Sequence, residues 1–243
     1  MSQMDRPTSA RRFENSSMTE RKIERYDAIL FDMDGVLLQG VTTLPEVYQR
    51  AAHDVIEEFD LVVPEERLPR LEKYTYDDQL ADCCRAVGID PERFWETRER
   101  YASERANRLL REGSREPFPD TAVLSELSAV LGVVSNNRDT TVKFVADNLL
   151  PGEFAVAMGR DPTVEGFRRR KPDSYYIDRA LSELDVDRAL YVGDRQSDVV
   201  AAYSAGIDAA FLRREHNSVM SVDPEPTLEL QGLDELVDFV DEA

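Results

Sequence analysis

The sequence predicts an α/β fold built around a parallel β-sheet. Short apolar runs at residues 28–31, 130–134, 189–192 and 208–212 lack helical periodicity, as expected of buried strands. Segments with helix signals separate several of these runs. Because strands that alternate with helices form parallel sheets with right-handed crossovers, we expect this architecture for the core.

Helix signals follow the second predicted strand and continue to the end of the chain. We expect helices near residues 121–129, 140–148, 174–184, 198–205 and 233–240. Most of these segments lie between predicted strands, where a parallel sheet needs crossover connections.

The segment between the first two strands predicts a separate helical unit. Val47, Ala51, Val55 and Phe59 follow helical spacing, and residues 44–115 as a whole have little β character. We therefore expect a small helical cap inserted after the first strand.

The predicted domain organisation has three parts. Residues 25–43 and 116–243 form the α/β core, and residues 44–115 form the cap. Residues 1–24 are polar and contain no apolar segment of signal-peptide length, so we predict a flexible extension there.

Composition limits the classes of function. With 243 residues, 42% of them hydrophobic, the chain can bury a sizeable core. A net charge of −19 argues against nucleic-acid binding, and no run approaches the roughly 18 apolar residues that span a membrane. Acid-rich, lysine-poor sequences resemble proteins of salt-accumulating halophiles, so we expect lower stability at low salt.

Cysteine and histidine add little to the prediction of function. Cys83 and Cys84 are adjacent, a spacing poorly suited to a structural disulfide, so we predict free thiols in a reducing cytoplasm. His53 and His216 are the only histidines, and two do not make a zinc site. We expect both to be surface or structural residues.

Two carboxylates follow the first predicted strand directly. Asp32 and Asp34 stand one residue apart and precede Gly35. At an effective dielectric constant of about 20, two charges a few ångströms apart repel by roughly 4 kcal/mol, so such a pair indicates a bound cation, a shared proton or wide solvent access. An ordinary Asp-Gly turn with a solvated acid is the alternative.

Other predicted strands also end in chemically capable side chains. Asp194 follows the run at 189–192, and Asp198 lies one helical turn further on. Ser135 and Asn136 follow the second strand and can bind phosphate oxygens, although an ordinary polar loop would look the same. Lys171 ends a cationic stretch and can reach a phosphate. Ligands of parallel α/β sheets bind at the carboxyl ends of the strands, so these side chains can meet.

These motifs, in this order, resemble those of haloacid dehalogenase-like (HAD) superfamily hydrolases. The resemblance is to the phosphatase type with a helical C1 cap, such as phosphoglycolate phosphatases. Residues 32–35 resemble the first motif of the family, Ser135 the second, Lys171 the third, and the segment from Asp194 to Asp198 the fourth. The resemblance implies a Rossmann-like core, a cap over the strand ends and a Mg²⁺ cofactor.

The resemblance also implies a role for each residue. Asp32 would be both metal ligand and nucleophile, and Asp34 would offer its backbone carbonyl to the metal and its side chain as general acid and base. Asp194 would be a second carboxylate ligand, supported by Asp198 directly or through water. Two further assignments concern the phosphate: Ser135 and Asn136 would hold its oxygens, and Lys171 would offset its charge.

The predicted function is a Mg²⁺-dependent phosphatase of a small phosphorylated metabolite, phosphoglycolate-like or a sugar phosphate. Dehalogenases of this fold lack an acid at the position of Asp34, because a halide leaving group needs no proton. Two alternatives remain: a phosphomutase of the beta-phosphoglucomutase kind, and a catalytically silent binding protein. We expect no nucleic-acid or membrane partner, and the sequence leaves the oligomeric state open.

Overall fold

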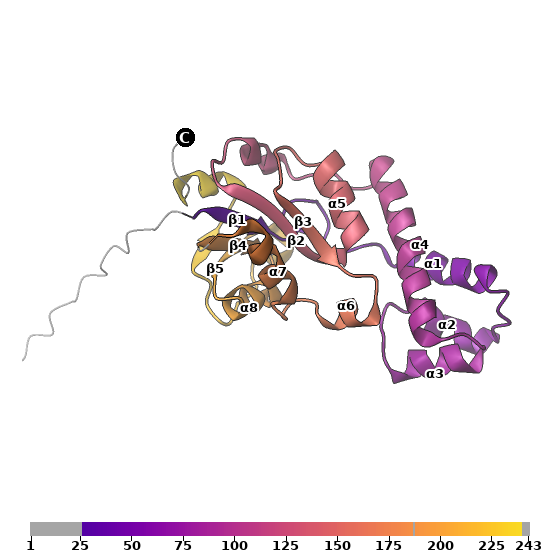
Figure 1. Ribbon diagram of the computed structural model, residues 1–243. Coiled ribbons are helices and arrows are strands. Elements are labelled where there is room, and N and C mark those ends of the chain that lie inside the picture. Colours follow the sequence, from indigo (N-terminus) through magenta and orange to yellow (C-terminus); the bar gives the residue numbers. More distant parts are fainter. Residues whose placement is uncertain (1–25, 187, 240–243) are drawn as a thin grey trace, which may run out of the picture.

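A computed structural model describes residues 26–186 and 188–239 of the chain. Their core is one six-stranded sheet in the order β3-β2-β1-β4-β5-β6, and every pairing in it is parallel (Figure 1). The predicted α/β, Rossmann-like core is thereby confirmed. The strands are β1 (Ala28–Phe31), β2 (Val130–Arg138), β3 (Val156–Arg160), β4 (Ala189–Gly193), β5 (Asp208–Leu212) and β6 (Leu228–Leu230).

The central strand β1 sets the geometry of the sheet edge. All four of its residues are fully buried, as expected for a strand with neighbours on both sides and helices on both faces. Phe31 pairs with Val133 of β2 and with Val192 of β4, so β1 and β4 end nearly level, whereas β2 continues to Arg138. The residues that follow β1 and β4 consequently lie next to one another, beside the extended end of β2.

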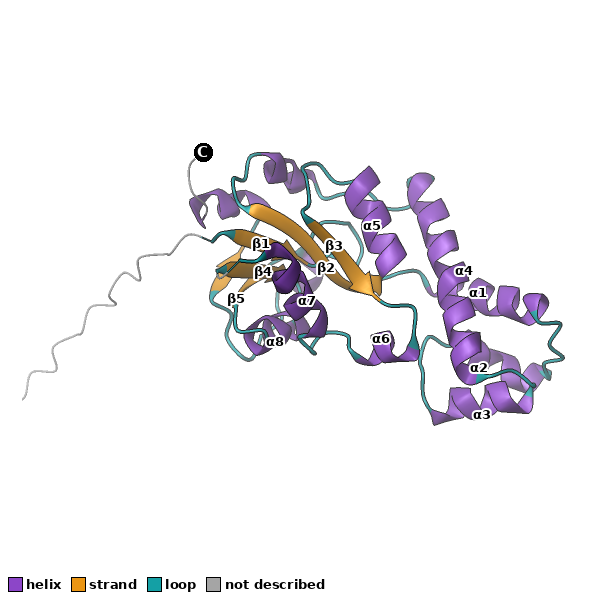
Figure 2. Ribbon diagram, in the orientation of Figure 1, coloured by secondary structure: helices purple, strands orange, loops and turns teal. Residues whose placement is uncertain are grey.

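Helices cover both faces of the sheet. Along β1, Ile29 and Phe31 face one apolar cluster and Leu30 faces the other, which is the two-residue alternation of a strand. The helix α5 packs on the first cluster, and α7 and α8 pack on the second (Figure 2). These helices and the short α6 have the bounds α5 (Asp139–Asn148), α6 (Val164–Arg168), α7 (Tyr175–Leu184) and α8 (Gln196–Ser204).

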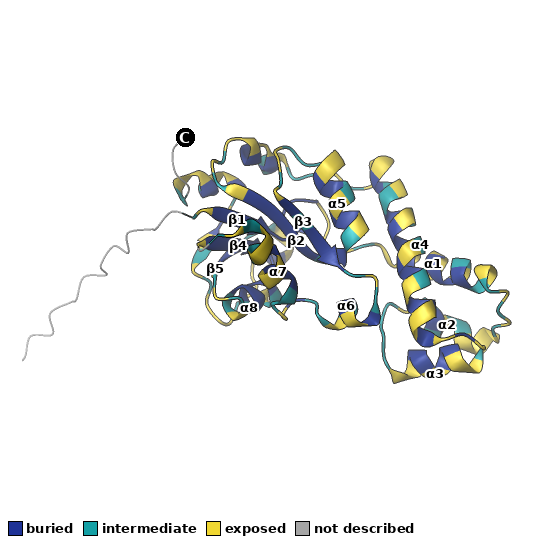
Figure 3. Ribbon diagram, in the orientation of Figure 1, coloured by how far each residue is buried: buried dark blue, intermediate teal, exposed yellow. Residues whose placement is uncertain are grey.

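Four α-helices lie between β1 and β2 and form a unit beside the sheet. They are α1 (Pro45–Glu58), α2 (Leu68–Glu72), α3 (Asp78–Ala86) and α4 (Pro91–Arg111), called the insertion below. Their outward faces are exposed, and the inward faces are buried (Figure 3). Trp95 of α4 is fully buried among aromatic rings. The buried residues of the insertion thus form an apolar cluster, to which Val164 of α6 also contributes.

Several predicted elements differ from the structure. Strands β3 and β6 were not predicted, because β3 contains Ala, Met and Gly, which have weak β-propensity, and β6 has only three residues. The helix expected at 121–129 is a 3₁₀ helix at Pro119–Ser125, and that expected at 233–240 is a 3₁₀ helix at Leu233–Phe239. Tertiary contacts, such as those of Asp120 with Arg214 and the backbone of Leu233, override local propensity there.

Two further predictions concern the ends of the chain and membranes. The expected extension at residues 1–24 lies outside the described residues. Within residues 26–186 and 188–239, no helix is both long enough and apolar enough to cross a bilayer.

Candidate active site

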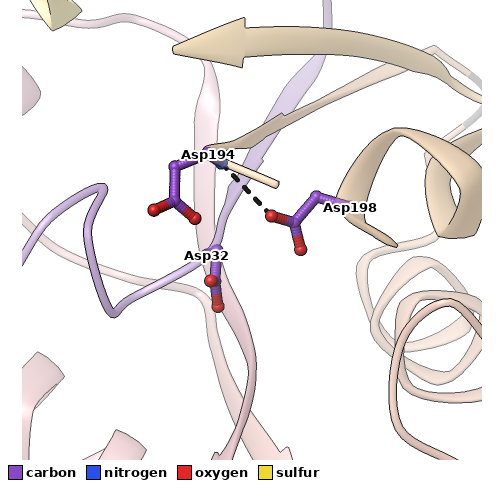
Figure 4. Close-up of side chains that lie close together, drawn as sticks. All are labelled: Asp32, Asp194 and Asp198. Carbon is purple, nitrogen blue, oxygen red and sulfur yellow. Dashed lines mark hydrogen bonds between the residues drawn. The ribbon is translucent and has the colours of Figure 1, made fainter. Parts of the chain in front are cut away.

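Three carboxylates from distant parts of the sequence meet at the carboxyl ends of the strands. Asp32 follows β1, Asp194 follows β4, and Asp198 lies in the first turn of α8. One oxygen of each lies within 4.8 Å of the others (Figure 4), and all three residues are at most 6% exposed. Among the described residues, this is the group of acidic, histidine and cysteine side chains whose arrangement could hold a metal ion.

The electrostatics of this acid cluster favour a cation. Burial, together with the charges of Asp32 and Asp198, raises the pKa of Asp194 to about 8. Oδ1 of Asp194 is buried without a hydrogen-bond partner. Mg²⁺ prefers carboxylate oxygens and a small number of protein ligands, so this orphaned oxygen beside Asp32 fits the metal that the sequence predicts.

Lys171 supplies the positive charge nearest to the acid cluster. Its Nζ lies 3.0 Å from Oδ1 of Asp32 and 2.7 Å from Oδ1 of Asp198. Burial lowers the pKa of Lys171, but the two carboxylates outweigh it, and the pKa lies well above its usual value. The hydroxyl of Tyr191 accepts a hydrogen bond from the same ammonium group. Lys171 is therefore a fixed cation beside Asp32.

Asp198 uses both of its oxygens for protein contacts. Oδ1 faces Lys171, and Oδ2 accepts from the backbone N–H groups of Asp194 at 3.2 Å and Arg195 at 3.0 Å. A Cβ on Gly193 would stand 2.2 Å from the Cβ of Asp198, so this close approach requires glycine. These contacts make Asp198 an organiser of the loop and of Lys171, and its predicted contact with a metal stays a prediction.

Asp34 lies apart from the acid cluster and has its own cation. Its Oδ1 is 2.7 Å from Nη1 of Arg115, and its Oδ2 accepts from Nδ2 of Asn137 at 2.8 Å. Gly35 has φ +86°, and a Cβ there would stand 2.2 Å from Oδ2 of Asp194. Glycine thus lets the turn after Asp34 pass over Asp194.

The predicted phosphate-binding residues lie at the end of β2, which runs four residues further than expected. Ser135 is buried, and its Oγ accepts from the backbone N–H of Asn137. The amide of Asn136 contacts the backbone of Lys171: its Oδ1 accepts from the N–H of Lys171 and its Nδ2 donates to the carbonyl of Lys171. Asn136 therefore positions the backbone that carries Lys171. The predicted contact of Asn136 with a phosphate stays a prediction.

These side chains surround a cavity of about 130 Å³ between the strand ends and the insertion. Tyr48 and Tyr74 come from the insertion, and their rings stack with centroids 3.9 Å apart. The polar residues of the wall are Asp32, Asp34, Thr42, Thr43, Ser135, Asn136, Asn137, Arg170, Lys171, Arg195, Ser197 and Asp198. The volume suits a small ligand.

Sequence reasoning missed three contributors to the site. His216, predicted to be structural or on the surface, has Nε2 at 2.6 Å from Oδ2 of Asp194, and burial followed by the charge of Arg195 lowers its pKa. The amide of Asn217 donates to the backbone carbonyl of Asp194. The third contributor is Arg115, which forms the ion pair with Asp34. The one available signal was that His216 and Asn217 lie in the loop that follows a predicted strand.

The two cysteines, His53 and two arginines of the insertion lie outside the site. Cys83 and Cys84 are free, buried thiols, as expected. His53 is an exposed partner of Glu72. Arg70 and Arg85 of the insertion form ion pairs with nearby aspartates. These residues thus have structural rather than catalytic contacts.

The sequence pattern of haloacid dehalogenase-like hydrolases matches residues 26–206. Because the match covers most of the chain, this protein belongs to that family. The resemblance to this superfamily, inferred from the four motifs, is thereby confirmed.

Curated relatives narrow the class of enzyme. The chain is 27% identical over 202 residues to the phosphoglycolate phosphatase of Neisseria gonorrhoeae, covering 76% of this chain and 78% of that protein. The phosphoglycolate phosphatase of Neisseria meningitidis is also 27% identical, with 76% and 79% covered. Together with the family match, these relatives confirm the prediction of an enzyme of the phosphoric monoester hydrolase class.

Solved structures support the fold. CbbY from Rhodobacter sphaeroides in complex with phosphate aligns with a TM-score of 0.58 at 21% identity, covering 88% of this chain and 96% of that one. The complex of a CbbY mutant with xylulose-(1,5)bisphosphate aligns with a TM-score of 0.55 at 22% identity, covering 88% and 96%. At such identities the likeness concerns the fold alone.

Proposed function

We propose that this protein is a Mg²⁺-dependent phosphatase that hydrolyses a small phosphate monoester through an aspartyl-phosphate intermediate. The observation that carries the proposal is the convergence of Asp32, Asp194 and Lys171, of which Asp32 and Lys171 line a small cavity. Phosphate monoesters hydrolyse extremely slowly unaided, so an enzyme must overcome anion repulsion and provide for the leaving oxygen. The residues of this cavity can meet both needs.

In the first step, a carboxylate oxygen of Asp32 attacks phosphorus, and the ester oxygen leaves. Asp34, which lines the same cavity, gives that oxygen a proton. In the second step, Asp34 takes a proton from a water molecule that attacks the phosphorus, and the bond to Asp32 breaks. The side chain of Asp34 thus serves as acid and then as base.

Other groups balance charge and hold the phosphoryl oxygens. Lys171 offsets negative charge on Asp32 and the phosphate, and Ser135 with nearby backbone N–H groups holds phosphoryl oxygens. Asp32, Asp194 and the backbone carbonyl of Asp34 would hold Mg²⁺, which would supply electrostatic stabilisation of the phosphoryl oxygens.

The substrate we propose is phosphoglycolate-like or a sugar phosphate. The small cavity volume and the phosphoglycolate phosphatases among the relatives support this choice. In this proposal the insertion is a cap whose Tyr48 and Tyr74 contact the part of the substrate beyond the phosphate. The cap would also exclude water from the reaction.

A screen of phosphate esters with Mg²⁺ tests the proposal. The net charge of −19 resembles that of proteins from salt-accumulating halophiles, and we propose the cytoplasm of such an organism as the setting of this enzyme. The screen should therefore be run at low and at molar KCl. We expect phosphate release from a small ester, loss of release in EDTA, and recovery with added Mg²⁺. Absence of release from every ester, or release insensitive to EDTA, contradicts the proposal.

Product analysis separates hydrolysis from phosphoryl transfer to a second sugar hydroxyl. If a sugar phosphate is isomerised, rather than dephosphorylated, in the presence of a bisphosphate activator, the protein is a phosphomutase. If the protein binds an ester but neither releases phosphate nor transfers the phosphoryl group, the remaining alternative is a catalytically silent binding protein.

A further inference from the structure

The two segments that join the insertion to the core lie side by side as a short antiparallel ribbon. Leu38 bridges to Pro117, the N–H of Gln39 donates to the carbonyl of Glu116 at 2.9 Å, and the N–H of Phe118 donates to the carbonyl of Leu37 at 2.9 Å. We call residues 37–40 and 115–118 the hinge ribbon. Any movement of the insertion relative to the sheet has to bend or twist the hinge ribbon.

One guanidinium group joins the hinge ribbon to Asp34. Nε of Arg115 donates to the carbonyl of Gln39 at 2.5 Å, and Nη2 donates to the carbonyl of Gly40. The remaining nitrogen, Nη1, lies 2.7 Å from Oδ1 of Asp34. Because the guanidinium is planar and rigid, its three nitrogens fix the carbonyls of Gln39 and Gly40 and the carboxylate of Asp34 relative to one another.

The contact is specific to one of the two neighbouring aspartates. Lys171 pairs with Asp32 and Asp198, whereas Arg115 pairs with Asp34. The side chains of Arg115 and Asp34 are only 15% and 13% exposed, so solvent screens this pair less than a surface pair. The other oxygen of Asp34 accepts a hydrogen bond from Asn137. Both oxygens of Asp34 therefore have partners, and the side chain also lines the cavity.

We propose that Arg115 is a positioning residue that fixes the side chain of Asp34 for proton transfer and couples its orientation to the hinge ribbon. The inference rests on the function proposed above, in which Asp34 donates a proton in the first step and accepts one in the second. Arg115 does not line the cavity, and its ion pair is with Asp34 and not with a carboxylate of the acid cluster. Its loss therefore affects proton transfer and leaves the attack of Asp32 intact.

The test compares Arg115→Gln with the parent on two esters. For p-nitrophenyl phosphate, whose leaving group needs no proton, we expect an unchanged burst of p-nitrophenol followed by slower turnover, because only the second step requires Asp34. For phosphoglycolate, or the alkyl ester that the parent hydrolyses best, we expect kcat to fall by about 10- to 100-fold with no burst. Arg115→Lys, which keeps the charge but not the fork, should recover part of the loss.

Arg214→Gln is the matched control. Nη2 of Arg214 also donates to a backbone carbonyl of the loop after β1, that of Val36, but its guanidinium pairs with Asp120 instead of Asp34. We expect Arg214→Gln to leave the ratio of the two activities unchanged. Thermal melts of all variants report whether they fold.

Two results would overturn the inference. One is an equal loss on both esters, including the burst, and the other is no loss on either. Failure of the proposed function is recognised separately, because the parent would then release no phosphate from either ester, or Asp32→Asn would be as active as the parent.

Discussion

The cavity has two walls from different parts of the chain, and their side chains are fixed in different ways. On the wall formed by the strand ends, Asp32 and Asp194 each follow a buried strand, and Lys171 pairs with Asp32. On the insertion wall, Tyr48 and Tyr74 stack, and the hydroxyl of Tyr74 accepts from Arg160 of β3. The first wall carries charge, and the second carries aromatic surface.

A buried ion pair connects the insertion wall to the sheet. Arg160 of β3 also binds Glu99 of α4, and both side chains are at most 1% exposed. The comparison teaches that charge for the chemistry is placed by the sheet, whereas the surface that meets the rest of the substrate depends on how the insertion docks. Substitutions on the two walls should therefore have separable effects.

The largest effect is expected from Asp32→Asn. Removal of the attacking carboxylate should lower kcat on every ester by about a thousandfold or more. The substitution removes one negative charge from the acid cluster, in which the carboxylates repel one another. The metal-free variant should therefore melt no lower than the parent. Steady-state kinetics and a thermal melt check both points. An Asp32→Asn enzyme that hydrolyses an aryl phosphate like the parent would remove the nucleophile assignment.

Glu99→Gln should alter the other wall and spare the chemistry. Breaking a buried pair leaves Arg160 without its carboxylate, and the variant should lose about 3–5 kcal/mol of unfolding free energy. Urea unfolding measures this loss. The control is Glu104→Gln on the same helix, because Glu104 is an exposed partner of Arg100 at 3.4 Å and should cost almost nothing. A burst of p-nitrophenol lost in the folded Glu99→Gln variant would show that the walls are not separable.

His216→Ala probes the support of the proposed metal. Side chains that orient a ligating carboxylate change metal affinity by about 10- to 100-fold, and His216 lies 2.6 Å from Asp194. We therefore expect Mg²⁺ to bind about 10-fold more weakly, measured by calorimetry on the variant without substrate. His53→Ala, which removes an exposed histidine of the insertion, serves as the control. Equal affinities in all three proteins would mean that His216 has no such role.

The last prediction is a pH dependence of metal-free stability. The pKa of Asp194 is raised to about 8 from 3.8, so the folded metal-free protein holds a proton that the unfolded chain has lost. Its contribution to stability is therefore present at low pH and is lost as pH rises from about 4 to about 8. Mg²⁺ binds the carboxylate form, so the stabilisation by Mg²⁺ should grow over that range. Melts in EDTA and in Mg²⁺ at several pH values check this, and Asp194→Asn should flatten both curves.

The sequence predicts the strand-end wall well, for a physical reason. A buried strand is an apolar run that local pattern reveals, and parallel strands bring their carboxyl ends to one edge, so Asp32, Asp194 and Ser135 could be placed together without coordinates. Asp34 was predicted by the same argument, but not its partner Arg115, because that pair depends on how two distant segments run side by side.

The insertion wall could not be predicted in the same way. Tyr48 and Tyr74 have the pattern of ordinary packing residues, and only the docking of the insertion through Arg160 brings them to the cavity. Likewise the hydrogen bonds between the amide of Asn136 and the backbone of Lys171 could not be predicted, because they join two segments that are distant in the sequence. Side chains whose role depends on tertiary contacts leave no local signal.

The most direct test of the central claim is to locate the phosphoryl group on the chain. Asp34→Asn should accumulate the intermediate from p-nitrophenyl phosphate, because the second step lacks its base. Acid quench, borohydride reduction and peptide mapping should then show homoserine in place of Asp32 and an unchanged Asp194. Reduction at another aspartate, or at none while p-nitrophenol is released in a burst, would contradict the account.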